Sequence, residues 1–301
     1  MRILMTGGTG LIGRAYVRRL LAAGHELTLL TRDARRAARL LGGHINTWNN
    51  LNEWQPELHF DVVLNLAGEP IFDRAWTQSR RAQLRASRID LTCRLVDRLL
   101  TANTRASLFI SGSAVGYYGH HPERTFDETA PPGNGFSAEL CRDWEHEALR
   151  AARHGIRTCI LRTGLVLSEH GGMLERMRLP FRFRIATRMG SGTQWMSWIH
   201  LEDYLDILDW LLTQPAASGI YNATAPGAVD HAAFVHELGR VHRCILTLPI
   251  PAGLLRGILG ERAELLLEGQ RVAPQRLLAA GFGFRFPDLP AALADLTRGQ
   301  R

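Results

Sequence analysis

The chain begins with an apolar segment, residues 3–5, that leads directly into three glycines spaced by three, Gly7, Gly10 and Gly13. Residues 11–21 follow with the apolar periodicity of an amphipathic helix, so the glycines fall on a strand-to-helix turn. Without a Cβ the backbone there can approach a pyrophosphate, whose charge is favoured by the N–H groups and dipole of the helix start. A second apolar strand, 26–30, lies at the spacing of a dinucleotide-binding unit. The pattern therefore predicts a dinucleotide site rather than a glycine-rich turn without a ligand.

The end of the second strand indicates which dinucleotide is bound. An NAD site usually has an acidic residue at this point, where it holds the ribose hydroxyls. This chain instead has Thr31 and Arg32, while Asp33 lies past the strand tip and Arg14 follows the third glycine. A guanidinium suits a 2′-phosphate, whereas a carboxylate would repel it. These residues favour NADP(H) as the cofactor, against the alternative that the arginines form only a solvated helix face.

The chain contains no lysine, so all 36 of its lysine-plus-arginine positions are arginine. This composition excludes a Schiff base, a P-loop lysine and a lysine that lowers the pKa of a catalytic tyrosine. The formal charge of +7 is spread along the chain without a basic tail or a nucleic-acid motif. It is therefore expected to reflect a small anionic ligand rather than nucleic acid.

Cysteine spacing and hydropathy restrict the remaining classes of protein. The four cysteines form no C-x-x-C pair or zinc pattern, so free thiols in a reducing compartment and no metal are expected. The N-terminal segment is the first core strand, without a charged leader, and no apolar run reaches membrane-spanning length. We therefore expect a cytoplasmic protein that does not enter membranes, with a symmetric homodimer as the base-rate expectation.

Strand and helix signals alternate through the first two-thirds of the chain. This alternation predicts an α/β fold, a doubly wound parallel sheet with helices on both faces, followed by a smaller and mainly helical C-terminal domain. We expect a dinucleotide-binding domain at 1–225, with a substrate-pocket insertion at about 168–195, and a C-terminal substrate or cap domain at 226–301. The predicted strands are 3–5, 26–30, 45–48, 62–66, 108–111 and 158–161, and the predicted helices are 33–41, 77–100 and 138–154.

Several sequence segments resemble one known group of enzymes. The chain is similar to extended short-chain dehydrogenase/reductases, which have a Rossmann fold, and more narrowly to atypical epimerase-family proteins with a C-terminal domain of unknown function. Four segments match the superfamily, namely the glycine motif 6–13, the adenosine loop 65–70, the serine segment 111–119 and the nicotinamide strand end 161–167. The stretch 266–276, Leu-Leu-Glu-Gly-Gln-Arg-Val-Ala-Pro-Gln-Arg, matches the narrower group.

The resemblance and the strand-end rule together assign the cofactor site, because ligands of such sheets bind beyond the carboxyl ends of the strands. The residues expected to bind NADP(H) are Gly7, Thr9, Gly10, Leu11, Ile12, Gly13, Arg14, Thr31, Arg32, Leu66, Ala67, Gly68, Glu69, Arg88 and Leu165.

The catalytic machinery departs from the superfamily pattern. Active members usually pair a serine with a tyrosine and a lysine four residues apart, in which the lysine makes the phenolate accessible. Ser113 matches the serine, but Phe136 and Leu140 stand where the tyrosine and lysine are expected. Either another group moves the proton or the fold keeps its cofactor pocket without the chemistry. The candidates for that group are Tyr117, Tyr118, Glu139 and Cys141, and Arg142 could stabilise a phenolate.

A substrate is expected beside these residues. Tyr118, Glu139 and Arg182 are the candidate substrate contacts, although a tyrosine here is more often a packing residue and Glu139 suits a helix start. The leading hypothesis is an NADP-dependent oxidoreductase or epimerase acting on a small polar substrate, anionic or sugar-like. The alternative is a non-catalytic NADP(H)-binding sensor or scaffold.

Overall fold

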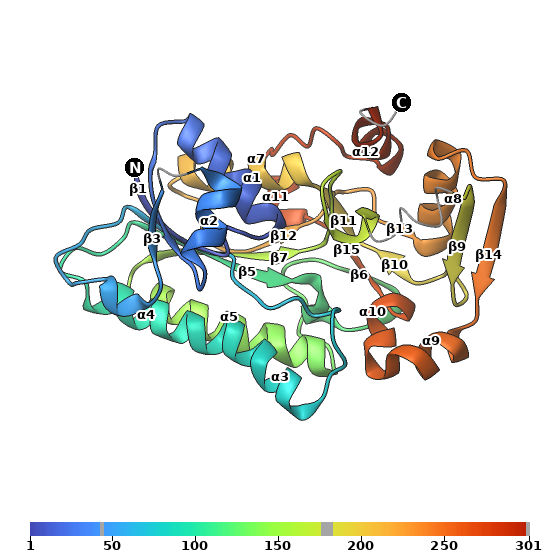
Figure 1. Ribbon diagram of the computed structural model, residues 1–301, viewed down its shortest axis with the longest axis horizontal. Coiled ribbons are helices and arrows are strands. Elements are labelled where there is room, and N and C mark those ends of the chain that lie inside the picture. Colours follow the sequence, from blue (N-terminus) through green and yellow to red (C-terminus); the bar gives the residue numbers. More distant parts are fainter. Residues whose placement is uncertain (43–44, 176–182, 299–301) are drawn as a thin grey trace.

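The computed structural model describes residues 1–42, 45–175 and 183–298. Its centre is a seven-stranded sheet of order β12-β7-β5-β4-β1-β2-β3, in which all neighbouring strands are parallel (Figure 1). The strands are β1 (Arg2–Thr6), β2 (Glu26–Leu30), β3 (Asn46–Trp48), β4 (Val62–Asn65), β5 (Leu108–Ala114), β7 (Arg157–Thr163) and β12 (Gly219–Ala223). The predicted doubly wound α/β fold is confirmed.

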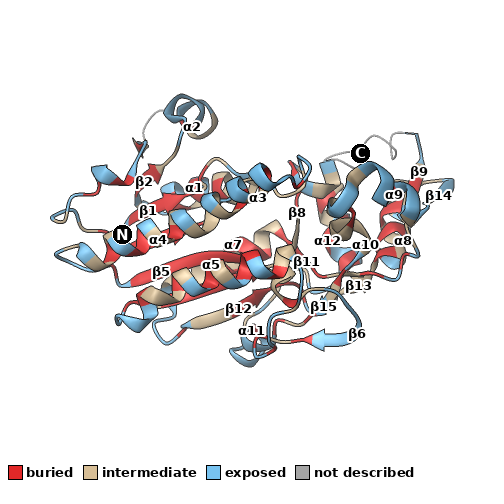
Figure 2. Ribbon diagram, turned by 90° about the horizontal axis from the view of Figure 1, so that it is seen from below, coloured by how far each residue is buried: buried red, intermediate tan, exposed pale blue. Residues whose placement is uncertain are grey.

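Helices cover both faces of this sheet because alternate residues of each buried strand are apolar on opposite sides. In β1, Ile3 and Met5 pack in the core shared with α1 and α7, whereas Leu4 packs in the core shared with α4 and α5. Figure 2 shows α5 and β5 lined with buried residues along their contact. The helices of this part are α1 (Leu11–Ala22), α2 (Ala34–Leu41), α3 (Gln78–Arg85), α4 (Leu91–Thr101), α5 (Phe136–Arg153), α7 (Leu201–Thr213) and α11 (Gln275–Ala279).

The predicted helix 77–100 is interrupted. A π-helical turn, Ala86–Asp90, joins α3 to α4 and carries Arg88. Turns of this kind are often found at functional sites, since the extra residue redirects a side chain. The turn brings the Arg88 guanidinium so close to Gly68 that a Cβ on that glycine would lie 2.9 Å from the Arg88 side chain.

The C-terminal region contains strands as well as the predicted helices. Its elements are β13 (Val229–Asp230), α8 (His231–Val241), β14 (Leu246–Ile250), α9 (Ala252–Leu259), α10 (Glu264–Leu267), β15 (Gln270–Val272) and α12 (Leu289–Leu296), besides α11. The short strands were not predicted because each gains its partner from far away in the chain. They pair with β10 (Trp195–Met196), β9 (Ile185–Met189) and β6 (His121–Phe126), while β8 (Leu165–Leu167) pairs with β11 (Trp198–His200).

The order of strands creates a crevice at one edge of the sheet. From β1 the chain proceeds to β2 and β3 on one side, and it then returns to form β4 and β5 on the other side. Ligands of open α/β sheets bind at such a reversal, outside the carboxyl ends of the strands. Across the described residues, no helix combines the length and apolarity needed to span a membrane.

Candidate functional site

The turn between β1 and α1 is built from close backbone contacts. Gly7 has φ +73°, and a Cβ there would lie 2.4 Å from the carbonyl oxygen of Leu66. A Cβ on Gly13 would lie 2.1 Å from the carbonyl oxygen of Gly7. Gly10, the N-cap of α1, supplies no side-chain hydrogen bond to the first turn. The helix therefore starts with N–H groups that are available to an anion.

A cavity of about 720 Å³ extends from this turn along the carboxyl edge of the sheet. Eleven of the residues predicted to bind cofactor or to act in catalysis line it: Gly7, Gly10, Leu11, Ile12, Gly13, Leu66, Ala67, Gly68, Arg88, Ser113 and Leu165. Beyond Ser113 the wall also includes residues that were not among the predicted cofactor or substrate contacts, among them His120, Asn134, Ser137, Cys141, Trp195, Met196, Glu264, Glu268 and Gln270. The C-terminal region thus supplies part of the wall of the cavity.

Buried polar contacts fix the loop after β4. The Thr6 hydroxyl donates to Asn65 Oδ1 at 2.8 Å and accepts the backbone N–H of Ala67 at 3.1 Å. Asn65 Nδ2 in turn donates to the Thr92 hydroxyl at 2.7 Å. Because these groups are buried and satisfied, Ala67 and the following Gly68 are held beside the glycine turn.

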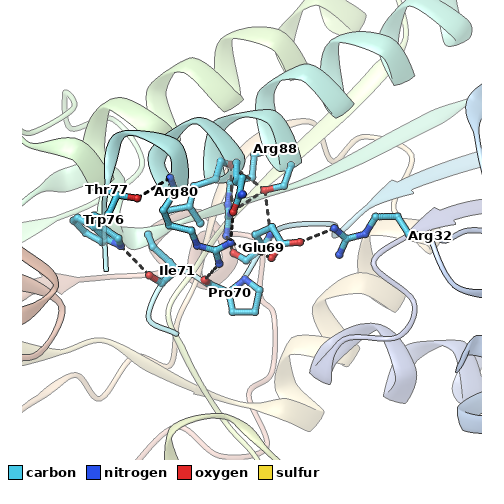
Figure 3. A network of polar contacts seen from close by, with 11 residues as sticks. Arg32, Glu69, Pro70, Ile71, Trp76, Thr77, Arg80 and Arg88 are labelled. Atoms are coloured by element: carbon cyan, nitrogen blue, oxygen red, sulfur yellow. Dashed lines mark hydrogen bonds and ion pairs between the residues drawn. The ribbon is translucent and has the colours of Figure 1, made fainter. Parts of the chain in front are cut away.

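A charged cluster lies at the tip of β2 (Figure 3). Arg32 Nη1 contacts Glu69 Oε1 at 2.6 Å, and Arg80 Nη1 contacts Glu69 Oε2 at 3.3 Å. The hydrogen bond and charge of Arg32, together with those of Arg80, hold the pKa of Glu69 below its usual range. The Arg32 side chain is 89% exposed, so it can exchange Glu69 for another anion. Arg88 donates to the Glu69 carbonyl oxygen at 3.0 Å, and burial lowers the pKa of its guanidinium.

The other predicted cofactor residues lie around the cavity rather than in its wall. Arg14 donates to the backbone carbonyl oxygen of His170. Thr31 accepts the Asp33 backbone N–H at 3.3 Å at the start of α2, and Thr9 is half-buried in the glycine turn.

Ser113, at the carboxyl end of β5, is held by a buried ion pair. Its hydroxyl donates to Glu145 Oε1 at 2.6 Å, and Ser113 is only 4% exposed. Arg162, from β7, donates from Nε to Glu145 Oε1 at 2.9 Å and from Nη2 to Oε2 at 2.8 Å. The contact with Glu145 raises the pKa of the Arg162 guanidinium, which therefore stays charged. The sequence prediction missed Glu145 and Arg162, although a charged residue within an apolar strand such as β7 is a recognisable signal.

Neither predicted tyrosine is among the residues that line the cavity, and both contact Arg162. The Tyr118 hydroxyl accepts from Arg162 Nη1 at 2.9 Å and donates to Asn222 Oδ1 at 2.6 Å. The Arg162 guanidinium lies 3.4 Å from the centre of the Tyr117 ring. Burial raises the pKa of Tyr117, and it raises the pKa of Tyr118 to about 12. Neither phenol is therefore prepared to lose its proton near neutral pH.

The same network reaches the C-terminal region. Asn222 donates from Nδ2 to the Ala273 carbonyl oxygen at 2.9 Å, and its backbone N–H donates to Glu128 Oε1 at 3.0 Å. The backbone N–H of Arg276 also donates to the Glu128 carboxylate at 3.3 Å. Residues 273–276 therefore support, through Asn222, the groups that hold Ser113.

The remaining predicted residues are distributed as follows. Leu140 lies in the cavity wall and packs with Phe136 in an apolar cluster, so no proton-transferring group replaces the tyrosine–lysine pair at those positions. Glu139 is exposed in the first turn of α5 and does not line the cavity. Arg182 lies outside the described residues.

Beyond Ser113 the cavity wall is polar. Ser137 donates to Glu264 Oε1 at 3.1 Å, and burial, with the neighbouring carboxylates Glu268 and Glu261, raises the pKa of Glu264. Burial likewise raises the pKa of the Cys141 thiol to about 11, so this thiol stays protonated at neutral pH. The arrangement can hold a dinucleotide along the glycine turn and a small polar molecule between Ser113 and Glu264.

Comparison with known proteins places the chain in a family. Residues 3–224 match the NAD dependent epimerase/dehydratase family, and residues 250–296 match a domain of unknown function, DUF1731. Epimerase family protein SDR39U1 from Mus musculus is 36% identical over 98% of this chain and 99% of its own. Epimerase family protein Mb2239 from Mycobacterium bovis is 39% identical, with coverage of 98% and 97%.

A solved structure shows the same likeness in three dimensions. The crystal structure of human epimerase family protein SDR39U1 (isoform 2) with NADPH superposes with a TM-score of 0.89 and 34% identity, covering 98% of this chain and 99% of that one. The predicted resemblance is confirmed. The chain belongs to the NAD-dependent epimerase/dehydratase family, among the SDR39U1-like epimerase family proteins that carry DUF1731 at the C-terminal end.

Proposed function

We propose that this chain binds NADP(H) and acts as an oxidoreductase or epimerase on a small polar ligand, with an active site that lacks the tyrosine–lysine pair. The observation that carries the cofactor choice is Arg32, an exposed guanidinium at the tip of β2 where an NAD site would have a carboxylate. The human relative that was crystallised with NADPH supports the same choice.

The residues of the glycine turn fit such a cofactor. Gly7 and Gly13 leave no room for a Cβ, and the open N-terminus of α1 faces the cavity. Leu66, Ala67 and Gly68 would line the adenosine side, and Leu165 the nicotinamide side. When bound, a nicotinamide supplies or accepts a hydride.

Arg32 would exchange its present partner for the 2′-phosphate. An exposed ion pair such as Arg32–Glu69 is worth about 0–1 kcal/mol. A phosphate carries up to about two negative charges, whereas a carboxylate carries one, so it attracts the same guanidinium more strongly. The exchange is therefore favourable, and Arg80 stays beside Glu69 to balance its charge.

The ligand would lie in the half of the cavity between Ser113 and Glu264. The carboxylates of Glu264 and Glu268 there favour a neutral, hydroxyl-bearing or sugar-like molecule over an anionic one. The sequence favoured an anionic ligand on the ground of the net positive charge, whereas the proposed ligand class follows from the described wall of the cavity.

A titration with NADPH and NADH tests the cofactor proposal. Trp144 lines the cavity beside Gly112, so quenching of tryptophan fluorescence reports binding. We expect Arg32→Ala to weaken NADPH binding about tenfold or more, the equivalent of one charge-assisted bond, and to leave NADH unchanged. Arg35→Ala, an exposed arginine in the first turn of α2, is the matched control.

Equal affinity of the wild-type protein for NADPH and NADH would contradict the choice of NADP(H). The non-catalytic alternative, a sensor or scaffold that binds NADP(H), is favoured by the lack of a tyrosine–lysine pair. Tight NADPH binding without any change in NADPH absorbance across a panel of hydroxyl- and carbonyl-bearing compounds would support that alternative.

A further inference from the structure

The hydrogen bond between Ser113 and Glu145 determines where the serine proton lies. Glu145 Oε1 accepts from Ser113 Oγ at 2.6 Å and from Arg162 Nε at 2.9 Å, while Oε2 accepts from Arg162 Nη2 at 2.8 Å. A carboxylate paired with a guanidinium is ionised and has no proton to give. The hydrogen of the short Ser113–Glu145 contact must therefore come from the serine.

Among the described residues, the Glu145 carboxylate is the strongest acceptor in contact with the Ser113 hydroxyl. Glu145 and Arg162 are 4% and 1% exposed at the side chain, so water does not share the bond. The Cys141 thiol, which lies beside Ser113, has a pKa raised to about 11 by burial and remains a weak donor. Turning the Ser113 hydroxyl away would leave a buried carboxylate oxygen with one donor fewer, at a cost equivalent to about tenfold or more in population.

We propose that Ser113 acts toward the ligand only as a hydrogen-bond acceptor, and that the cavity therefore selects an alcohol over the corresponding ketone. This inference rests on the proposed function, since it concerns the ligand that would lie beside the cofactor. A ligand hydroxyl can donate to the free lone pairs of Ser113 Oγ. A carbonyl, carboxylate or phosphate oxygen would face those lone pairs without a proton between them.

A second serine in the cavity wall has the same polarity. Ser137 Oγ donates to Glu264 Oε1 at 3.1 Å, so this serine too offers lone pairs to the cavity. Asn134 and Gln270 complete the wall with amides, which can donate or accept. Two fixed acceptors and two adaptable amides in one wall suit a molecule that carries several hydroxyl groups, or a hydroxyl and an amine.

A pair of probes of equal shape tests the inference. Cyclohexanol and cyclohexanone differ only in the group that Ser113 would contact, and their binding to the NADPH-loaded protein can be measured by saturation-transfer NMR, with absorbance monitored to detect turnover. We expect the wild-type protein to prefer the alcohol about tenfold or more. Ser113→Ala should reduce this preference to about twofold or less, because the acceptor is gone.

A double variant keeps Ser113 but removes the carboxylate that fixes the direction of its hydroxyl proton. Glu145→Leu combined with Arg162→Met replaces the buried ion pair by apolar side chains, a change that folded proteins often tolerate. The Ser113 proton is then free to turn toward the ligand, and the preference should fall as in Ser113→Ala. Glu147→Gln, on the same helix and paired with Arg150 outside the cavity wall, should keep the wild-type preference.

Equal or tighter binding of the ketone by the wild-type protein, or an alcohol preference that survives Ser113→Ala, would overturn the inference. Neutron diffraction from crystals exchanged into D₂O decides the point without any probe. Deuterium between Ser113 Oγ and Glu145 supports the inference, and deuterium directed into the cavity overturns it. Because cofactor-free crystals suffice, this result stands even if the NADPH titration contradicts the proposed function.

Discussion

The two ends of the cavity are built in different ways. At the glycine end, the shape of the wall depends on close backbone contacts at residues that have no side chain. At the Ser113 end, the geometry depends on a chain of buried charged and polar side chains drawn from α5, β7 and β12. A backbone site tolerates almost no added atom but needs few partners, whereas a side-chain site depends on every member of its network. The two ends should therefore fail in different ways when they are altered.

The largest expected effect concerns the Ser113 end. Glu145→Ala leaves the buried Arg162 guanidinium without its carboxylate, which should cost about 3–5 kcal/mol of the free energy of unfolding. Urea denaturation followed by circular dichroism measures this cost.

The double change Glu145→Leu and Arg162→Met should recover most of the loss, because no charge remains buried without a partner. If the double variant were no more stable than Glu145→Ala, the network would not be the determinant of stability at this end.

At the glycine end the corresponding change is Gly13→Ala. Its Cβ would lie 2.1 Å from the Gly7 carbonyl oxygen, so the turn must move. We expect NADPH affinity to fall about a hundredfold, roughly 2.7 kcal/mol, in the fluorescence titration. Gly257→Ala, where the added Cβ meets nothing within 4 Å, is the control and should keep wild-type affinity.

A smaller change in NADPH affinity is expected from a substitution beside the glycine end, at Glu69. Glu69→Gln removes the carboxylate that holds Arg32, so NADPH should bind about threefold more tightly, as expected for an exposed ion pair. Glu57→Gln, an exposed glutamate, controls for the change in net charge. Unchanged affinity in Glu69→Gln would show that Glu69 does not compete with the phosphate.

The contribution of the Glu69 ion pairs to the stability of the fold should also depend on pH. Because Arg32 and Arg80 hold the pKa of folded Glu69 below its usual range, the pair stabilises the fold above the ordinary glutamate pKa. That contribution is lost as the pH falls through the lowered pKa. The acid-unfolding curves of wild type and Glu69→Gln should therefore converge in that range.

The last prediction concerns a reaction rate in the wild-type protein and involves no substitution. The Cys141 thiol at the Ser113 end has a pKa of about 11, so its alkylation by iodoacetamide should be slow at pH 8 and should accelerate as the pH approaches that value. Peptide mass spectrometry separates Cys141 from the other three cysteines. Rapid modification of Cys141 at pH 8 would contradict its buried, protonated state.

The comparison also explains which features the sequence could predict. The glycine turn is local, since its strand, its three glycines and its helix all lie within residues 3–21. The cavity wall contains all three glycines, as the sequence predicted. The Ser113 network is not local, because Ser113 and Glu145 are 32 residues apart and Tyr118 and Asn222 are 104 apart. No spacing rule connects such positions.

Similar reasons apply to the fold. The long buried strands and amphipathic helices were predictable from periodicity, whereas β14 and β15 pair with strands whose own sequences give only weak signals. Tyr117 and Tyr118 illustrate the limit for sites. Their closeness to Ser113 in sequence suggested a proton donor, but the turn after β5 directs both rings toward Arg162 and away from the cavity.

While the chain is still being synthesised, the parts of the cavity become available at different times. The glycine turn and its sheet neighbours can assemble as soon as the first strands leave the ribosome, since domains tend to fold from the N-terminal side. Asn222 and Glu128, however, have partners in Ala273 and Arg276, which lie 51 and 148 residues later in the chain. A nascent chain should thus hold a cofactor pocket before it holds a closed ligand pocket, because the support of the ligand pocket waits for residues 273–276.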